Sequence, residues 1–569
     1  MKKQLLTALL CLYFFTSYSQ FSNTWSVKLA NAILTRHTPT INAMTGKGWE
    51  YSNSIVLHGM EKVYYHTLDA SYLAYIKAYV DTYVDASGNI TGLAQNLDKI
   101  HPGIICLFLW EKTGLLKYKT AATNLRNYLM NGAPAYPTTP NGGYWHKNNG
   151  SYNDIMMADG IYMAHPFLAK YGALFGDNAA LDKAASQTML LAGYLQSANN
   201  LFKHAWNYPK TATWCDPATG VSKEVWSRGM GWYMMALVDI LKYLPASHAN
   251  YTPMKNLLAT LAIGIQNTQD PTTGLWYQVV DKAGSAGNYL ETSGSAMFVY
   301  ALKTAVTYGW INASFLTVAQ NGWTGLQTKI TTVADGPKVN DFAPAMGVQT
   351  NYSAYVAITS VDCPGSVHPH GYAAILMAGS VMEFSAASMP VKFASFTATR
   401  KNHSVWLKWA NSDNEEAAQF IIERSENGIH FNGFGNLPPN KSGKYDWVDH
   451  LPAPNTNYYR IKALGLDGTV CYSTVINIYW SKSSLNISVL PNPVKNGYLN
   501  VQVEDLKSGN YSLNVVNSGG ELIVSKTFKA KDGRLVKSLR LPQGLHKGMY
   551  CVQLKGGETV AVSKMVLVD

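Results

Sequence analysis

Four clusters in the first two thirds of the chain carry side chains with catalytic and ligand-binding chemistry. They are NLDKIHPG at 96–103, GGYWHK at 142–147 with MMADGIYMAHPF at 156–167, HAW at 204–206 with VWSRGMGWY at 225–233, and GLWYQVVD at 274–281 with GNYLETS at 287–293. Carboxylic acids transfer protons, and a guanidinium group binds a carboxylate through two parallel hydrogen bonds. Indole faces stack on sugar rings. The clusters therefore offer candidates for proton transfer, carboxylate binding and sugar stacking.

Asp159 is the strongest candidate for a proton donor. It lies in an apolar run, MMADGIYM at 156–163, at the predicted start of a helix. An apolar setting raises the pKa of a carboxyl because it disfavours the ion, so the acid stays protonated near neutral pH. The alternative role is an N-cap for the helix. Asp98 has the same alternative as a cap or turn residue, and it pairs with Asp159 only if the fold brings both into one cleft.

Trp226, Arg228 and Trp232 are candidates for holding a sugar that carries a carboxylate. On an ideal helix Trp226 and Arg228 point about 200° apart, at 100° per residue. They share a site only if Trp226 precedes the first regular turn. The alternative is a pair of core tryptophans with a surface arginine.

The remaining candidates are His146 with Lys147, His204 and Tyr51. His146 and Lys147 would hold an anion, or they are simply a polar loop. Tyr51 is the weakest candidate, and core packing is its alternative role.

Helical spacing of apolar residues dominates the first 388 residues. Clear examples are 24–43, 159–174, 179–199, 225–244 and 293–308, joined by loops rich in Gly, Pro, Asn and aromatics. Ten or more helices in pairs are too many for a four-helix bundle. We therefore expect a domain at 22–388 that forms a toroid of helical hairpins with aromatic-rich loops at one mouth.

The two ends of the chain differ from this helical region. Residues 1–19 read as a signal peptide, with Lys2 and Lys3 before a short apolar run and a small-x-small site before Gln20. No later stretch reaches the 18 apolar residues of a membrane span. After residue 390, alternating strand runs separated by turns predict a β-sandwich at 391–481 and a second β-rich unit from residue 485.

The net charge of +11 comes mainly from the tail, because residues 482–569 hold 12 Lys and Arg against 6 Asp and Glu. The helical region is nearly neutral, so charge does not indicate a strong anion-attracting field there. No basic stripe accompanies the aromatics, which argues against a nucleic-acid partner. The five cysteines left after the signal are widely spaced, so neither a disulfide framework nor a metal site is expected.

A series of phrases in the helical region resembles a known family. In chain order they are WHK, MADGIYMAHPFLAKYG, WSRGMGWYMMALVD, GLWYQVVDKAG and GNYLETSGSAMFVYAL. Together they resemble glycoside hydrolase family 105, the unsaturated rhamnogalacturonyl hydrolases, which are relatives of the family 88 unsaturated glucuronyl hydrolases. The resemblance covers about residues 25–388.

The resemblance implies an (α/α)6 barrel in which Asp159 is the general acid and base. It also implies a set of residues that line the site: Asp98, His146, Lys147, His204, Trp226, Arg228 and Trp232. The implied substrate is an oligosaccharide left by a polysaccharide lyase, whose terminal uronic acid has a C4=C5 double bond. Asp159 would protonate C4, water would add at C5, and the hemiketal would collapse. No metal or organic cofactor is implied.

Two departures from the family pattern bear on specificity. Family members often carry Trp two residues before the catalytic acid, where this chain has Met157. Residues 341–371, which include Cys363 and His368-Pro369-His370, match the pattern poorly and are expected to set a different substrate preference. The parent polymer, pectin or an algal glycan such as ulvan, stays open.

The β regions also resemble known modules. Residues 391–481 look like a fibronectin type III-like sandwich that acts as a spacer. LPNPV at 490–494 opens a tail, 485–569, that resembles the type A sorting domain of the type IX secretion system of Bacteroidetes. This implies a monomeric enzyme exported through the periplasm to the cell surface or beyond. An appended carbohydrate-binding sandwich is the alternative for the tail.

Two other functions compete with the unsaturated uronyl hydrolase. One is a polysaccharide lyase or an ordinary inverting glycosidase on the same barrel, because a fold does not fix the chemistry. The other is a non-catalytic glycan-binding surface protein, against which the intact set of Asp98, His146, Asp159 and Arg228 argues.

Overall fold

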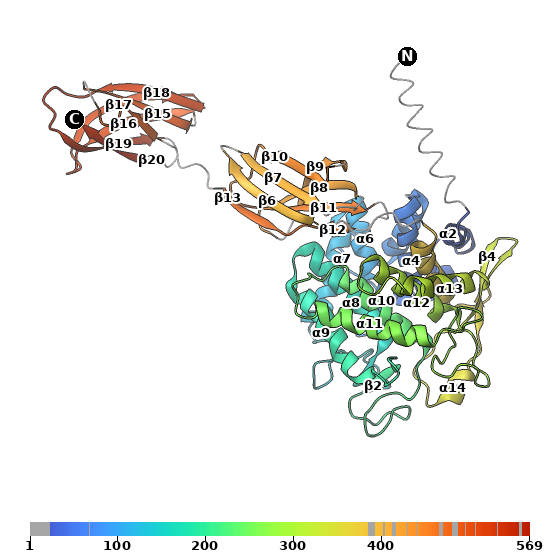
Figure 1. Cartoon of the computed structure of the whole chain (residues 1–569). Helices are drawn as coiled ribbons and strands as arrows, with labels where there is room; N and C mark the ends of the chain where they lie inside the picture. The colour runs from blue at the N-terminus through green and yellow to red at the C-terminus, as the bar shows by residue number, and fades with distance from the viewer. Residues whose placement is uncertain are drawn as a thin grey trace, which may run out of the picture.

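The structure is a computed structural model in three parts that follow one another along the chain, a helical domain and two β-domains (Figure 1). It describes residues 23–568 except 68, 385–392, 402–403, 412–416, 429–430, 441, 466–469, 481–486, 495–496, 507, 532 and 557–559. The predicted signal peptide at 1–19 lies outside the described residues.

Six helices form the inner ring of the helical domain. They are α4 (Tyr51–Thr67), α6 (Gly103–Thr113), α8 (Ala158–Phe175), α10 (Ser227–Leu241), α12 (Thr292–Thr307) and α15 (His370–Met382). Each packs against the next in this order, and α15 packs against α4, so the ring closes. The helices α8, α10 and α12 are buried along almost their whole length, as expected for helices that are covered on every side.

Six further helices of the described chain alternate with these in sequence and pack outside them. They are α2 (Trp25–Arg36), α5 (Ala70–Tyr83), α7 (Leu116–Asn131), α9 (Asn178–Leu195), α11 (Tyr251–Asn267) and α13 (Phe315–Gln327). In each, buried positions recur at helical spacing and the other face meets solvent. Pairs of one outer and one inner helix confirm the predicted (α/α)6 barrel (Figure 1).

Short elements fill the connections between the helices. They are α3 (Asn42–Thr45), η1 (Leu97–Lys99), β1 (Ile155–Met157), β2 (Ala205–Asn207), β3 (Ile330–Val333), β4 (Gly336–Phe342), α14 (Tyr352–Val356) and β5 (Val361–Cys363). The single helix predicted at 24–43 is wrong, because it ends at Arg36 and a separate turn follows as α3. Pro39 disfavours helical backbone at the residue before it, which accounts for the break.

All inner helices begin at the same end of the barrel, which we call the mouth; the opposite end is the base. Glycine is the third residue of α8, α10 and α12, as Gly160, Gly229 and Gly294. A methyl group on these would lie 3.0 Å from His146 Nδ1, 3.1 Å from His204 Cδ2 and 2.6 Å from Ser227 Cβ, respectively. The glycines therefore let the mouth loops close onto the helix starts.

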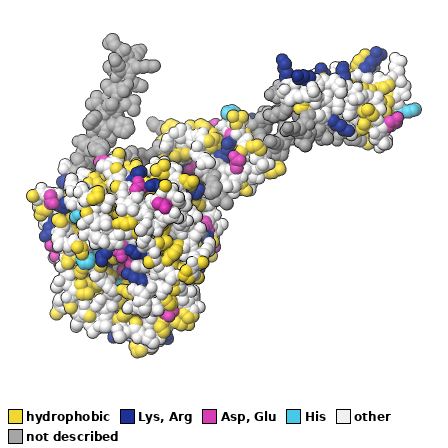
Figure 2. Space-filling view, turned by 180° about the vertical axis from the view of Figure 1, so that it is seen from behind, with side chains coloured by type: hydrophobic (Ala, Val, Ile, Leu, Met, Phe, Trp, Pro, Cys, Tyr) yellow, Lys and Arg dark blue, Asp and Glu magenta, His cyan; other side chains and the backbone are white. Residues whose placement is uncertain are grey.

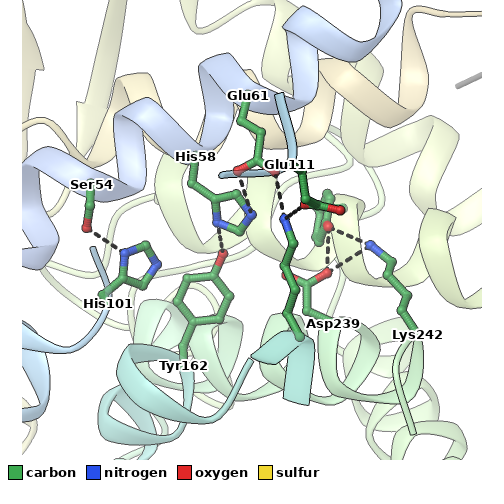
Figure 3. Close-up of polar contacts among 10 residues, drawn as sticks. Ser54, His58, Glu61, His101, Glu111, Tyr162, Asp239 and Lys242 are labelled. Carbon is green, nitrogen blue, oxygen red and sulfur yellow. Dashed lines mark hydrogen bonds and ion pairs between the residues drawn. The ribbon is translucent and has the colours of Figure 1, made fainter. Parts of the chain in front are cut away.

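A buried polar network fills the barrel interior toward the base (Figure 3). Lys170 Nζ lies 3.4 Å from Glu61 Oε1 and 3.0 Å from Glu111 Oε2. Asp239 accepts hydrogen bonds from Tyr300 Oη at 2.7 Å and Lys242 Nζ at 2.8 Å. Two lysines of the network thus lie against its three carboxylates, Glu61, Glu111 and Asp239.

Two histidines continue this network toward the mouth. His101 Nδ1 lies 2.6 Å from Ser54 Oγ, and His58 Nδ1 lies 3.3 Å from Tyr162 Oη (Figure 3). Burial lowers the pKa of His101 to about 3, although the nearby charge of Asp98 acts in the opposite direction. His101 is therefore neutral at ordinary pH.

The first β-domain is a sandwich of two antiparallel sheets. One sheet contains β6 (Phe393–Lys401), β7 (Ser404–Asn411) and β10 (Lys444–Asp449). The other contains β8 (Ala417–Ser425), β9 (Asn432–Leu437), β11 (Asn455–Gly465), β12 (Val470–Tyr472) and β13 (Ile476–Trp480). Trp409, Phe420 and Tyr445 stack within the core between the sheets.

This sandwich contacts the base of the barrel. Lys462 Nζ lies 3.8 Å from Glu111 Oε1, and Tyr472 packs against the hydrophobic core of the barrel. The guanidinium of Arg460 lies 4.1 Å from the centre of the Tyr472 ring and holds it in place. The sandwich thus contacts the barrel through the long side chains of Lys462 and Tyr472.

The second β-domain is also a two-sheet sandwich. One sheet contains β14 (Ile487–Leu490), β15 (Tyr498–Leu506) and β18 (Gly533–Arg540), and the other contains β16 (Gly509–Val516), β17 (Leu522–Ala530), β19 (Gly548–Gly556) and β20 (Val560–Val568). Figure 2 shows Lys and Arg side chains gathered on this domain, in agreement with the charge distribution along the chain.

Candidate active site

A pocket of about 210 Å³ opens at the mouth of the barrel. It is lined by Tyr51, Asp98, His146, Lys147, Tyr152, Met157, Asp159, Met163, Ala345, Met346 and Gly347. Pockets for drug-sized ligands are larger, roughly 300–1,000 Å³, so this volume suits one sugar unit. Five of the lining residues were predicted from the sequence, and the fold brings both candidate acids, Asp98 and Asp159, to the same pocket.

Two basic side chains hold Asp98 in place. Its carboxylate lies 2.6 Å from Lys147 Nζ and 3.4 Å from His146 Nε2, and its side chain is 3% exposed. Burial lowers the pKa of His146, while the charge of Asp98 partly offsets that effect. Asp98 also lines the pocket, so its carboxylate oxygens are placed to accept a hydrogen bond from a ligand hydroxyl.

Asp159 is the second residue of α8 and faces His204. The distance from Asp159 Oδ2 to His204 Nε2 is 3.1 Å. Burial alone would raise the pKa of the Asp159 carboxyl, but His204, His146 and Arg228 together hold that pKa below its usual value. The expectation of a raised pKa is therefore wrong, because the apolar neighbours in sequence are not the groups that face the carboxylate.

His204 is completely buried and has partners on both ring nitrogens. Its Nε2 faces Asp159, and its Nδ1 lies 2.7 Å from the Tyr355 hydroxyl. The backbone holds the ring in position, because His204 N–H donates to Ser222 Oγ and Ala158 N–H donates to the His204 carbonyl. Asp159, His204 and Tyr355 thus form one buried chain of hydrogen-bonding groups.

Trp226 precedes α10 as its N-cap in extended conformation, which is the geometry required for it to share a site with Arg228. The Arg228 guanidinium lies 4.6 Å from the centre of the Trp226 ring. However, Arg228 donates to the carbonyl oxygens of Ala343 and Pro344 and to Ser293 Oγ, and it is only 1% exposed. Its guanidinium therefore anchors the 341–371 loop and supplies positive charge from behind the pocket wall.

Trp232 lies away from the pocket. Its ring stacks on Tyr162 at a centroid distance of 4.9 Å, and the residue is 2% exposed. Trp232 is the sixth residue of α10, at the same depth as the pocket residue Met163 in α8, but its ring turns toward Tyr162. The structure therefore places it as support for the barrel interior and not among the lining residues.

The 341–371 loop, which matched the family pattern poorly, builds one wall of the site. Residues 345–347 line the pocket, and Tyr355 contacts His204. His370, at the start of α15, lies with Nε2 3.1 Å from the Tyr51 hydroxyl, so Tyr51 is a pocket residue held from behind. The loop thus positions Tyr51 of α4 and His204, which lies just before β2.

Several residues of the site were not predicted. Tyr152 lines the pocket and its ring receives Lys147 Nζ at 5.3 Å from the centroid. Glu291 is fully buried and accepts hydrogen bonds from Ser227 Oγ, Ser293 N–H and Ala343 N–H. The sequence did contain one repeated pattern that marks the helix starts at the mouth. Asp159, Arg228 and Ser293 each precede a glycine at the start of an inner helix.

The convergence of the inner helices favours a negatively charged ligand. Each helix N-terminus carries a partial positive charge of about half an elementary charge, which stabilises a nearby anion. At the mouth these termini join Lys147 and the buried Arg228. The same field would attract the carboxylate of an acidic ligand.

Comparison with known proteins identifies the class of the barrel. The model of glycosyl hydrolase family 88 matches residues 25–385, and the secretion system C-terminal sorting domain matches residues 488–568. The chain belongs to glycosyl hydrolase family 88. It is 38% identical over 147 residues to Protein Atu3128 of Agrobacterium fabrum and to the 24.9 kDa protein in picA locus of Rhizobium radiobacter. That match covers 26% of this chain and 62% of each relative, which is less than two thirds of their length.

Solved structures of similar proteins agree with this assignment. A glycoside hydrolase from family 105 of C. acetobutylicum is 31% identical, with a TM-score of 0.59 over 63% of this chain and 99% of that one. A possible family 105 member from Klebsiella pneumoniae shares the fold at 23% identity, with a TM-score of 0.51 over 58% of this chain and 81% of that one. In the part of the chain that the structure describes, no helix is both long and apolar enough to span a bilayer.

Proposed function

We propose that this protein removes the terminal 4,5-unsaturated uronic acid from oligosaccharides that a polysaccharide lyase has produced. The observation that carries the proposal is the meeting of Asp159 and Asp98 in a sugar-sized pocket, with Lys147 in its lining and Arg228 acting on Asp159. Membership of family 88 and the similarity to a family 105 enzyme support the same reaction class. The pocket fits one acidic sugar, which is the unit to be removed.

In the proposed reaction Asp159 donates its proton to C4 of the unsaturated sugar. Water then adds at C5 and returns a proton to Asp159, so one water molecule is consumed and the acid is regenerated. The resulting hemiketal opens at the ring oxygen to a 5-keto group, and the freed C1 hemiacetal releases the rest of the oligosaccharide. The glycosidic bond therefore breaks without direct attack at C1, and a single proton-transfer carboxyl is sufficient.

The charge state of Asp159 must change when substrate binds. In the empty site the surrounding cations keep its pKa low. A bound uronate brings a second negative charge and displaces water, and both effects favour the protonated acid. Binding of the anionic sugar thus prepares the proton donor, whereas a neutral sugar would leave Asp159 ionised.

The other pocket residues would hold the sugar during this step. Asp98, fixed by Lys147 and His146, accepts a sugar hydroxyl, and Tyr152 and Met157 offer apolar faces. Met157 stands where many family members have Trp, so stacking on that side is weaker. Arg228 contributes its charge from behind the wall and keeps the 341–371 loop closed.

We also propose that the enzyme acts outside the cell. The match of residues 488–568 to a secretion system C-terminal sorting domain supports export by the type IX pathway, after a signal peptide at 1–19 directs the chain to the periplasm. A lyase that acts on an extracellular polymer, pectin or an ulvan-type algal glycan, would supply the substrate.

The test is the near-ultraviolet absorbance of the double bond, measured with the full mature chain. Lyase-generated oligosaccharides from pectin and from algal glucuronans are the two substrate sets, and Asp159→Asn is the control. We expect absorbance to fall with one set, which then identifies the parent polymer. A rise in absorbance on intact polymer would instead indicate a lyase, and new reducing ends from saturated oligosaccharides without any absorbance change would indicate an ordinary inverting glycosidase.

A further inference from the structure

Tyr355 lies directly behind the residue that faces the candidate acid. Its hydroxyl is 2.7 Å from His204 Nδ1, while His204 Nε2 is 3.1 Å from Asp159 Oδ2. Both Tyr355 and His204 are fully buried, so water does not compete for the Nδ1 atom. Tyr355 belongs to α14, His204 lies just before β2, and Asp159 belongs to α8. The three side chains therefore meet only in the folded protein.

The Tyr355 ring is held by its own surroundings. It packs in a cluster with Trp226, Val279 and Ala343, and Gln278 Nε2 donates to the Tyr355 carbonyl at 3.2 Å. The first two packing partners belong to the barrel, although Tyr355 itself belongs to the 341–371 loop. The phenol is therefore fixed in direction, and its oxygen stays aimed at Nδ1.

We propose that Tyr355 is a positioning residue that keeps the Nδ1–H of His204 occupied, so that Nε2 remains the atom that exchanges a proton with Asp159. This inference rests on the proposed function and assigns a role in it to the loop that departs from the family pattern. Asp159 and His204 then hold one proton between them as a coupled pair, and C4 of the substrate receives that proton.

The geometry accommodates both states of the pair. In the first, His204 is protonated, Nε2–H donates to the Asp159 carboxylate, and Nδ1–H donates to Tyr355 Oη. In the second, the proton has moved to Asp159, whose O–H donates to Nε2, and Nδ1–H still donates to Tyr355. Only one proton moves, over the 3.1 Å that separates the two atoms, and Tyr355 is an acceptor throughout.

This arrangement explains how a carboxyl with a lowered pKa acts as an acid. Burial would raise the pKa of Asp159, and His204, through its charge and its hydrogen bond, is the main group that lowers it. Entry of an anionic sugar shifts the proton toward Asp159. Loss of the Nδ1 acceptor would leave a buried N–H unsatisfied, which disfavours the protonated ring.

Other charged groups face the pair from the surrounding elements. His146 and Arg228 lower the pKa of Asp159, Asp98 and Lys147 act on it through His146, and Glu224 faces Tyr355. None of these groups lies within the Tyr355–His204 contact. The Tyr355 hydroxyl also forms a hydrogen bond with the backbone of Gln349, so Tyr355→Phe removes that contact as well, and the imidazole ¹⁵N shifts isolate Nδ1.

Tyr355→Phe in the full chain tests the role. We expect kcat to fall at least tenfold with KM within about twofold, and the alkaline limb of the kcat profile to move about one pH unit lower, because a hydrogen bond to a charged group is lost. Tyr352→Phe is the matched control on the same helix, since the Tyr352 hydroxyl donates to the Ala286 carbonyl and not to His204. Its profile should overlay that of the wild type.

A second measurement is independent of activity. The ¹⁵N shifts of the His204 imidazole in the wild-type chain, assigned by their loss in His204→Gln, should show the proton on Nδ1 when the ring is neutral. A proton on Nε2, or a Tyr355→Phe profile that overlays the wild type, would overturn the role. Failure of the wild type to consume unsaturated oligosaccharides would instead overturn the proposed function, whatever the tautomer.

Discussion

The mouth and the base of the barrel both bury charged groups, but they do so differently. At the base, Lys170 bridges Glu61 and Glu111, and the side chains involved are at most 5% exposed. At the mouth, Asp98 and Asp159 border an open pocket, and Asp159 is 14% exposed. The carboxylates at the base are thus enclosed and lie against lysines, whereas those at the mouth line a pocket that a ligand can enter.

The inner helices thus carry buried ion pairs that stabilise the fold at the base and candidate catalytic groups at the mouth. The same inner helices supply both ends, since Asp159 and Lys170 belong to α8 and Arg228 and Asp239 belong to α10. A buried ion pair that loses one partner costs roughly 3–5 kcal/mol, because the remaining charge stays buried. We therefore expect changes at the base to lower stability without changing turnover, and changes at the mouth to do the reverse.

The largest effect is expected at the mouth. Asp159→Asn removes the proton donor and should lower kcat by about 10²–10⁴-fold, the usual range for general acid catalysis. The amide keeps the size of the side chain, so calorimetry should show substrate binding within a few-fold of the wild type. Full activity in this variant would remove Asp159 from the mechanism.

At the base the strongest effect is expected from Lys170→Met. Glu61 and Glu111 would then face each other without the lysine, and the free energy of unfolding should fall by about 3–5 kcal/mol. Below the new melting temperature, kcat should equal that of the wild type. Lys77→Met is the control, because its pair with Asp81 is partly exposed and should contribute less than about 1 kcal/mol. Equal losses in the two variants would contradict a special role for the base.

The pH dependence of stability gives a further test of how the mouth differs from the base. Because the folded pKa of Asp159 lies below its ordinary value of 3.8, the unfolded chain binds the proton first as pH falls. The contribution of Asp159 to stability is therefore complete well above pH 4 and disappears as pH falls through the folded pKa. The difference in melting temperature between the wild type and Asp159→Asn should shrink below pH 4, and a difference that grows in acid would contradict the lowered pKa.

The smallest effect is expected where the sandwich meets the barrel. Lys462→Met removes a 3.8 Å contact with Glu111, whose main partner Lys170 remains. The loss should be about 1 kcal/mol or less, seen as a shift of a few degrees in the melting temperature with unchanged activity. A change in kcat would mean that the sandwich communicates with the mouth.

The sequence alone was enough to predict the barrel architecture and most of the residues along one side of the pocket. Helical spacing at 159–174 and 293–308 predicted α8 and α12 within a residue or two, because long buried helices have strong periodicity. The shared motif order with a known family then placed Asp98, His146, Lys147 and Asp159, which the structure brings to one pocket.

The other features of the site depend on contacts between segments that are far apart in the sequence. Tyr355 is 151 residues from His204, and His370 is 319 residues from Tyr51, so no local pattern links them. The pKa of Asp159 was misjudged for the same reason, since His204 and Arg228 face it from other elements. Trp232 was predicted to line the site, but its ring stacks on Tyr162 instead. A shared motif does not show which way a side chain points from its helix.

The most direct test of the account is the reaction run in D₂O with the full chain on the lyase-generated oligosaccharide that it consumes. If Asp159 protonates C4, the product sampled early should carry one deuterium at C4 while the double-bond absorbance disappears at the same rate. Asp159→Asn should show neither change. Release of the terminal sugar with its double bond intact and no deuterium at C4 would contradict hydration and show direct hydrolysis at C1.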